Sequence, residues 1–202
     1  MTDRPILFSA PMIRALLDGR KTQTRRILKP QPDMTKISQP CHPEPRGNGR
    51  WVWMARDDFP EYSYATADFK VRFAKGDRLW VRERVWLPEG NDPRGHVTYH
   101  ADHGDDRALK WRPGIHMPRW ASRITLTVTD VRAQRLQEIS EADAIAEGAP
   151  AVISGQGVDG PVKTHRTGFV GIWNKINGNW LDNPWVVAIT FVVEQRNTLH
   201  KE

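Results

Sequence analysis

Apolar residues recur at helical spacing close to the start of the chain. Four of them would share one face of a helix: Met12, Ile13, Leu16 and Leu17. Ser9, just before this segment, is a residue type that caps helix N-termini. Gly19 follows the last apolar position, where a glycine can take the left-handed conformation that ends a helix. The pattern therefore predicts a short amphipathic helix between Ser9 and Gly19.

Two further helices are predicted in the second half of the chain. Ser140, with Asp143 three residues later, has the residue types of a helix N-terminus, and Gly148 marks the end of the same segment. Another run of apolar residues at helical spacing covers residues 168–176. The sequence thus predicts three helices in all, each of them short.

Several other segments have the pattern of β-strands. Apolar and polar residues alternate in residues 78–83 and 122–131, and a shorter strand is expected over residues 97–101. Residues 185–193 are almost continuously apolar, which is typical of a central strand buried on both faces. Because strands outnumber helices and alternate irregularly with them, we expect an α+β fold: a mixed sheet curled into a small β-barrel with flanking helices.

Prolines interrupt these patterns after the first helix. Five prolines lie between residues 30 and 45, which predicts an irregular insertion over about residues 30–75 with only a brief strand at 51–54. The glycine-rich segment 154–160 lacks the Lys-Ser/Thr ending of a phosphate loop, so we expect a flexible loop there. At 202 residues the chain is long enough for one well-buried domain, and we expect a single domain over residues 1–202.

Charge indicates the kind of partner. A net charge of +6 and a pI near 9.7 favour an anionic partner, most commonly nucleic acid or a nucleotide. No apolar run approaches the roughly 20 residues needed to span a bilayer, and the N-terminal residues lack a signal-peptide layout. We therefore expect a cytoplasmic monomer that binds no membrane. The single cysteine, Cys41, excludes an internal disulfide and a thiolate-rich zinc site, and no metal or other cofactor is expected.

A basic segment, GRKTQTRR at residues 19–26, directly follows the first predicted helix. Four cations and two threonines in eight residues are atypical of a core, so we expect an exposed loop held by a rigid base. Such loops commonly bind or catalyse. An alternative is that Arg20 and Lys21 only interact with the carbonyl end of the helix, which favours positive charge.

Glu147 is the acidic residue that local structure explains least. It falls in the last turn of its helix, where the dipole disfavours a negative charge, and one turn from Asp143. It is either a solvated surface residue or it pairs with Lys21 or an arginine of the basic segment. In the second case Lys21, whose neutral form is favoured by neighbouring cations, is a candidate base. Thr24 is then the candidate nucleophile, since a hydroxyl needs such a base to attack a carbonyl.

A second cluster of interest lies in residues 111–123, WRPGIHMPRWASR. It contains Trp111, Arg112, His116, Arg119, Trp120 and Arg123. Alternating tryptophan and arginine is suited to stacking a base and holding a phosphate or sugar. The alternative is a bent segment whose tryptophans are buried and whose arginines are solvated. The histidines and aspartates of residues 96–106 are interpreted as a hydrated turn and not as a metal site.

Five ordered stretches of the chain resemble the ASCH family of the PUA-like superfamily, especially its long members from phages and prophages. They are RPILFSAPMIRALLDGRKTQTRR, GDRLWVRERVW, KWRPGIHMPRWASRITLTVTDV, LQEISEADAIAEG and NPWVVAITF. The resemblance covers both ends and most of the middle of the chain. It implies a compact β-barrel with flanking helices, and a bacterial or phage-infected cell as the setting.

The resemblance also implies a function. The best-understood relatives are small amidohydrolases that remove the acetyl group from N4-acetylcytidine with a Lys and a Thr in a GRKTxTxR loop and a Glu at the end of a later helix. Carried over to this sequence, these residues are Lys21, Thr24 and Glu147. Arg26 would steady the oxyanion, and the remaining expected substrate contacts are Arg20, His116, Arg119, Trp120 and Arg123. This chain is about twice as long as the small enzymes, so the substrate that the resemblance implies is either a free modified nucleoside or a modified base in RNA or DNA.

Two other functions fit the same residues. A non-catalytic PUA-like module would bind RNA or DNA through Lys21, the arginines and Trp120, without needing Thr24. A metal-independent ribonuclease would use Lys21, Glu147 or His116 as acid and base.

Overall fold

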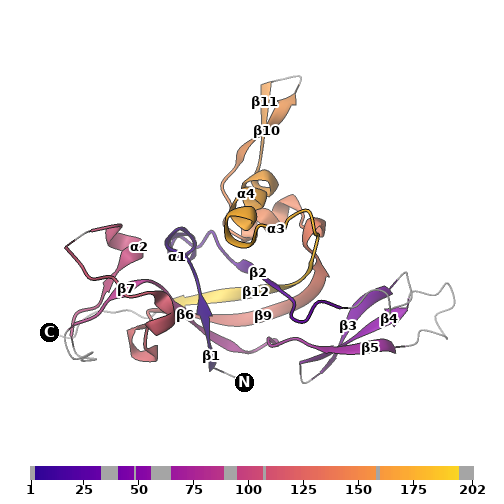
Figure 1. Cartoon of the computed structure of the whole chain (residues 1–202), viewed down its shortest axis with the longest axis horizontal. Coiled ribbons are helices and arrows are strands. Elements are labelled where there is room, and N and C mark those ends of the chain that lie inside the picture. Colours follow the sequence, from indigo (N-terminus) through magenta and orange to yellow (C-terminus); the bar gives the residue numbers. More distant parts are fainter. Residues whose placement is uncertain are drawn as a thin grey trace. The chain divides into compact units, whose positions relative to one another are not determined.

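The computed structural model describes residues 3–32, 41–47, 49–55, 65–88, 95–106, 108–157 and 160–195 (Figure 1). The chain divides into two compact units, each assembled from separate stretches. Unit 1 comprises Met1–Thr22, Gly76–Thr129 and Phe191–Glu202, and unit 2 comprises Gln23–Lys75 and Asp130–Thr190. The single-domain expectation stays a prediction.

The described chain is a mixed α+β fold with many strands and few helices, as predicted. Its largest sheet has the hydrogen-bonded order β1-β6-β9-β12-β2. The strands of this sheet are β1 (Asp3–Leu7), β6 (Arg78–Arg82), β9 (Ile124–Arg135), β12 (Trp185–Gln195) and β2 (Gln23–Ile27). β1 runs parallel to β6, whereas β6 is antiparallel to β9 and β12 is antiparallel to β2. The apolar strand β12 therefore has a neighbour on each side, as its sequence predicts, and the strands among the described residues form no closed barrel.

In unit 1, the first predicted helix is present as α1 (Ala10–Leu17). Ser9 occupies its N-cap position, and Gly19 has a φ of +70°, the left-handed conformation expected where the helix ends. The predicted strand at 97–101 is shorter than expected. Only β8 (Thr98–Tyr99) pairs, with β7 (Val85–Trp86), and the chain then turns into the single helical turn α2 (His100–His103).

In unit 2, the expectation of an irregular insertion is wrong for its described residues. Most of them form an antiparallel sheet, β3 (Cys41–Gly47), β4 (Arg50–Ala55) and β5 (Ala65–Lys70), with β4 in the centre. The prolines Pro43 and Pro45 lie in β3, at an edge of the sheet, where a missing N–H breaks no ladder. Only the brief strand expected at residues 51–54 is confirmed.

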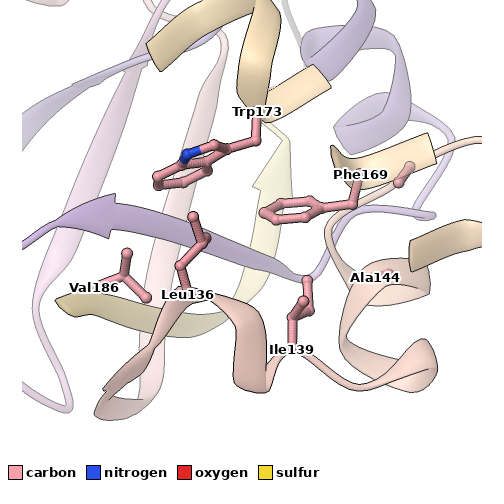
Figure 2. Packing of buried hydrophobic residues seen from close by; sticks show 7 residues of the cluster. Leu136, Ile139, Ala144, Phe169, Trp173 and Val186 are labelled. Carbon is pink, nitrogen blue, oxygen red and sulfur yellow. The ribbon is translucent and has the colours of Figure 1, made fainter. Parts of the chain in front are cut away.

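Two helices of unit 2 pack on each other and enclose a hydrophobic cluster (Figure 2). They are α3 (Glu141–Ala146) and α4 (His165–Asn177), which starts three residues before the predicted range. The buried cluster consists of Leu136, Ile139, Ala144, Ala149, Phe169, Trp173 and Val186. It joins both helices to the end of β9 and the start of β12.

The glycine-rich segment after α3 belongs to a β-hairpin, so the expectation of a flexible loop there is wrong. β10 (Val152–Gly157) pairs antiparallel with β11 (Gly160–Thr164), and Figure 1 shows the pair extending beyond α3 and α4. Gly160 has a φ of +118°, a conformation that side-chain-bearing residues rarely adopt. The glycines thus serve the turn and bulge of a strand pair.

Candidate functional site

The basic segment is not the exposed loop that its composition predicts. Its second half is the strand β2, whose Thr24 pairs with Ile189 and whose Arg25 pairs with Ala188 of β12. Lys21, Thr24 and Arg25 are only 1%, 3% and 3% exposed. Backbone pairing with the apolar strand β12 therefore places the side chains of Thr24 and Arg25 in the protein interior.

The first two cations of the segment lie in unit 1. Arg20 remains exposed, and its guanidinium is 2.7 Å from the Asp18 carboxylate. The Lys21 backbone N–H donates to the Ala15 carbonyl at 2.9 Å, and the Lys21 ammonium lies 5.5 Å from the centre of the Phe8 ring. A cation over an aromatic face is stabilised by the ring quadrupole, which offsets part of the cost of burial.

Glu147 in unit 2 is buried, so the solvated-surface alternative is wrong. Helix α3 begins as its sequence predicts, because the Ser140 side chain accepts a hydrogen bond from the Asp143 backbone N–H. Glu147 follows the last helical residue, and Gly148, with a φ of +75°, turns the chain away. The Glu147 residue is 5% exposed and points toward β2.

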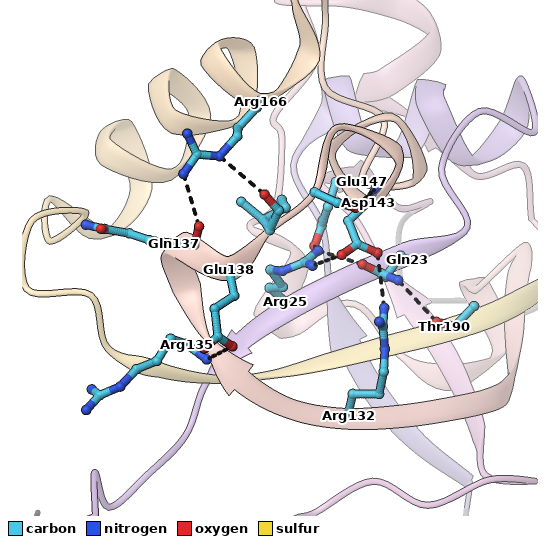
Figure 3. Close-up of polar contacts among 12 residues, drawn as sticks. Gln23, Arg25, Arg132, Arg135, Gln137, Glu138, Asp143, Glu147, Arg166 and Thr190 are labelled. Atoms are coloured by element: carbon cyan, nitrogen blue, oxygen red, sulfur yellow. Dashed lines mark hydrogen bonds and ion pairs between the residues drawn. The ribbon is translucent and has the colours of Figure 1, made fainter. Parts of the chain in front are cut away.

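An arginine of the basic segment is the partner of this carboxylate (Figure 3). Arg25 Nη1 donates to Glu147 Oε1 at 3.2 Å and to Gln23 Oε1 at 2.6 Å. Arg25 Nη2 donates to Asp143 Oδ2 at 2.9 Å. The two carboxylates of α3, one helical turn apart, are thus held by one guanidinium, which removes their mutual repulsion.

Further contacts fix the residues around Arg25. Arg132 of β9 donates from Nη2 to Asp143 Oδ1 at 3.1 Å, and Gln23 Nε2 donates to Thr190 Oγ1 at 3.3 Å. Burial disfavours the ionised form of Asp143, but the hydrogen bond from Arg132 and the charges of Arg25 and Arg132 outweigh it and lower its pKa.

Alternation along β2 separates its polar residues into two groups. Gln23 and Arg25 point to one face of the sheet, and Thr24 and Arg26 point to the other. Burial lowers the pKa of Arg26, and the negative charge of Glu147 opposes this effect. Glu147 therefore interacts electrostatically with Arg26 as well as with Arg25.

The residues of the second predicted cluster, in unit 1, are largely engaged with the protein itself. Arg123 donates to both oxygens of the buried Glu83, at 2.9 and 3.1 Å, and to Asp102 at 2.6 Å. Its guanidinium also lies 3.9 Å from the centre of the Tyr99 ring. Arg119 donates to Asp3 at 3.2 Å. Arg119 and Arg123, two of the arginines expected to hold a phosphate, thus already have carboxylate partners.

The aromatic and histidine residues of this cluster are placed differently from one another. Trp111 and Trp120 are half-buried, and Trp120 packs against the cluster of Val85, Leu87, Tyr99, Met117 and Ala121. His116 is exposed at the end of a short 3-10 turn, Gly114–His116. The roles of Arg119, Trp120, Arg123 and His116 in substrate binding stay predictions, and the alternative of buried tryptophans with solvated arginines does not describe Arg123.

Sequence reasoning missed Arg25, Gln23 and Asp143 as members of the site. A signal for them was present, because Asp143 and Glu147 lie one turn apart on the same helix and require a nearby cation if both are buried. The identity of that cation is a tertiary fact, since Arg25 is 122 residues from Glu147 along the chain.

Comparisons with known proteins do not test the resemblance to the ASCH family, which stays a prediction. No family model, no curated protein and no solved structure matches this chain. In the part of the chain that the structure describes, no helix is long and apolar enough to cross a membrane. The same described residues contain no group of three or more His, Cys, Asp or Glu side chains arranged to hold a metal ion.

Proposed function

We propose that this protein is an amidohydrolase that removes an acyl group from the exocyclic amine of a modified cytosine, as in N4-acetylcytidine, with an ASCH-type PUA-like fold. The observation that carries the proposal is the burial of Lys21, Thr24 and Glu147, which are 1%, 3% and 5% exposed. Removing ionised groups from water costs free energy that ion pairs seldom recover in full. Titratable groups kept at such cost cluster at functional sites.

In the proposed reaction, Lys21 in its neutral form accepts the proton of the Thr24 hydroxyl. Thr24 Oγ forms a bond to the acyl carbonyl carbon, and the bond from that carbon to the exocyclic nitrogen then breaks. The amine leaves with a proton delivered by Lys21 or Glu147, and water hydrolyses the acyl-threonine ester to release the carboxylic acid. Arg26 and nearby backbone amides steady the negative charge on the carbonyl oxygen.

Covalent geometry supports part of this arrangement. Lys21 and Thr24 are three residues apart, so their Cα atoms lie at most about 11 Å apart whatever the fold around them. The electrostatic interaction of Glu147 with Arg26 brings the carboxylate close to the strand that carries Thr24. The joint action of Lys21, Thr24 and Glu147 is the part that the experiment below tests.

Burial also argues against a purely nucleic-acid-binding role for this segment. Phosphate contacts need cations open to solvent, since neutralising a phosphate requires direct approach. Lys21 and Arg25 are almost fully buried, and the exposed Arg20 is paired with Asp18.

The test is hydrolysis by the purified protein, with EDTA present, of N4-acetylcytidine, its deoxy form and acetylated RNA. Formation of the deacylated product, which is cytidine, deoxycytidine or, after digestion of the RNA, cytidine from the polymer, is followed by chromatography for the wild type and for Lys21→Ala, Thr24→Val and Glu147→Gln. The proposal expects turnover that is lost in all three variants. Thr129→Val, at an exposed position of β9, is the matched control and keeps full turnover.

Two outcomes would overturn the proposal. Absence of turnover on every substrate, together with salt-sensitive binding to RNA or DNA, would leave the non-catalytic module. Metal-independent cleavage of RNA that survives Thr24→Val but not His116→Ala would leave the ribonuclease.

A further inference from the structure

Arg25 is a buried cation that lies between an aromatic ring and two carboxylates. Its side chain has no exposed surface, and its guanidinium lies 5.8 Å from the centre of the Phe169 ring. Two residues later on the same face of β2, Ile27 packs against the hydrophobic cluster of α3 and α4. On this face of β2, Arg25 therefore makes ionic contacts, whereas Ile27, two residues later, makes apolar ones.

Stability alone does not account for this difference. Replacing a complete buried ionic cluster by well-packed apolar side chains is often neutral or stabilising, because desolvation offsets the attraction between the charges, whereas removing one partner alone leaves an uncompensated charge. Arg25 Nε is moreover buried without a hydrogen-bond partner among the described residues, which adds a further cost. The benefit of an arginine here is therefore geometric.

Both terminal nitrogens of the Arg25 guanidinium are held by hydrogen bonds. Nη1 binds Glu147 and Gln23, and Nη2 binds Asp143. The acceptors are themselves fixed: Asp143 by Arg132 of β9, and Gln23 by Thr190 of β12 (Figure 3). A planar guanidinium with both ends occupied has one orientation, so the direction of its bond to Glu147 Oε1 is determined as well.

We propose that Arg25 is a positioning residue, which fixes the Glu147 carboxylate for proton transfer by binding it and Asp143 with separate guanidinium nitrogens. The inference rests on the proposed function, since it assigns Arg25 a role in the same reaction. Arg25 does not touch the substrate and acts only through Glu147. The Asp143 contact serves as the fixed point against which Glu147 is oriented.

The first test separates orientation from fold. Arg25→Met keeps an unbranched side chain but removes all three hydrogen bonds, so kcat falls by about 100-fold, as expected when a catalytic group is displaced by about 1 Å. KM changes by less than about threefold, because substrate contacts remain. Arg25→Lys keeps a cation but cannot hold both carboxylates, so it restores the fold while kcat remains at least about tenfold low.

The matched control is Arg135→Met in the same unit. Like Arg25, Arg135 makes a hydrogen bond and lies near an aromatic ring: it donates to the Asn183 backbone carbonyl at 3.1 Å, and its guanidinium lies 4.7 Å from the centre of the Trp185 ring. Its loss perturbs packing without touching Glu147, so kcat stays at the wild-type value. Equal losses of kcat in Arg135→Met and Arg25→Met would indicate a structural role for Arg25 and overturn the inference.

A second readout does not depend on turnover. With 13C-labelled glutamate, the Glu147 carboxyl signal, assigned through Glu147→Gln, is single and sharp in the wild type and in Arg135→Met. It shifts and broadens in Arg25→Met and in Arg25→Lys, because the carboxylate then samples several orientations.

The two readouts keep the two proposals apart. A wild type without turnover overturns the proposed function, and the carboxyl signal then decides alone whether Arg25 holds Glu147. An active wild type whose Arg25→Lys variant keeps both full kcat and an unchanged carboxyl signal overturns the positioning role and leaves the proposed function standing. Should Arg25→Met not fold, Arg25→Lys and Asp143→Asn carry the same comparison.

Discussion

The indole rings of Trp53 and Trp185 meet edge to face, with ring centres 4.4 Å apart and ring planes at 66°. Trp53 belongs to the sheet of the insertion and Trp185 to the start of β12, and both lie in unit 2. Trp53 also stacks on Phe69 of β5, with centres 4.8 Å apart. One side chain therefore joins the insertion sheet to β12, an interior strand of the large sheet.

Replacing this side chain tests that junction. Trp53→Ala is expected to lower the free energy of unfolding by roughly 3–5 kcal/mol, since a fully buried tryptophan leaves a large cavity. Urea unfolding followed by circular dichroism measures the change. Leu181→Ala, at a position 89% exposed, is the control and should change stability by less than about 0.5 kcal/mol. Equal effects of the two changes would show that the insertion sheet is not fastened through Trp53.

The sequence predicts those elements whose signals are local. The cap and stop residues around α1 and α3 and the alternation in β6 and β9 all correspond to observed elements. The insertion sheet was not predicted because its edge strand carries Pro43 and Pro45, and prolines are normally evidence against a strand. The hairpin of β10 and β11 was not predicted because a glycine-rich composition is common both in flexible loops and in tight strand pairs.

The candidate site shows a different limit. Residue types alone pointed to Lys21, Thr24 and Glu147, since few other groups can activate a hydroxyl. The burial of the basic segment could not be read from its composition, because four cations in eight residues indicate exposure unless acidic partners are known. Those partners, Asp143 and Glu147, come from a helix more than 100 residues away in the chain.

Two glycines of α4 provide a matched test of helix packing. A Cβ on Gly168 would lie 1.9 Å from the Pro150 carbonyl oxygen, whereas a Cβ on Gly171 would meet no atom within 4 Å. Gly168→Ala therefore forces α4 away from the loop after α3, with an expected loss of about 2 kcal/mol or more. Gly171→Ala should stabilise the protein by about 0.5–1 kcal/mol, through the higher helix propensity of alanine. Thermal unfolding measures the stability of both variants against the wild type. A stabilising effect of Gly168→Ala would contradict the observed packing.

Arg123 is expected to act on stability more than on substrate binding. It binds Glu83, which is almost fully buried, and removing the arginine leaves an uncompensated buried charge. Arg123→Ala should cost roughly 3–5 kcal/mol, the range measured for broken buried pairs. The double variant Arg123→Met with Glu83→Leu should recover most of this loss, because it removes both charges. Affinity for a nucleotide that falls in Arg123→Lys while stability is retained would instead support the predicted phosphate contact.

Stability toward acid should depend on Asp143. Its pKa is lowered from 3.8, because the contacts with Arg132 and Arg25 outweigh the effect of burial. A carboxyl group whose pKa is lower in the folded state stabilises the fold above the unfolded pKa, and this contribution is lost as the pH falls through the folded value. The difference in unfolding free energy between wild type and Asp143→Asn should thus be constant near neutral pH and shrink below about 3.8. Urea titrations at a series of pH values measure it. If the difference in unfolding free energy stayed constant through the acid range, Arg25 and Arg132 would not stabilise the ionised Asp143. Asp143 could then not serve as the fixed contact against which Arg25 orients Glu147.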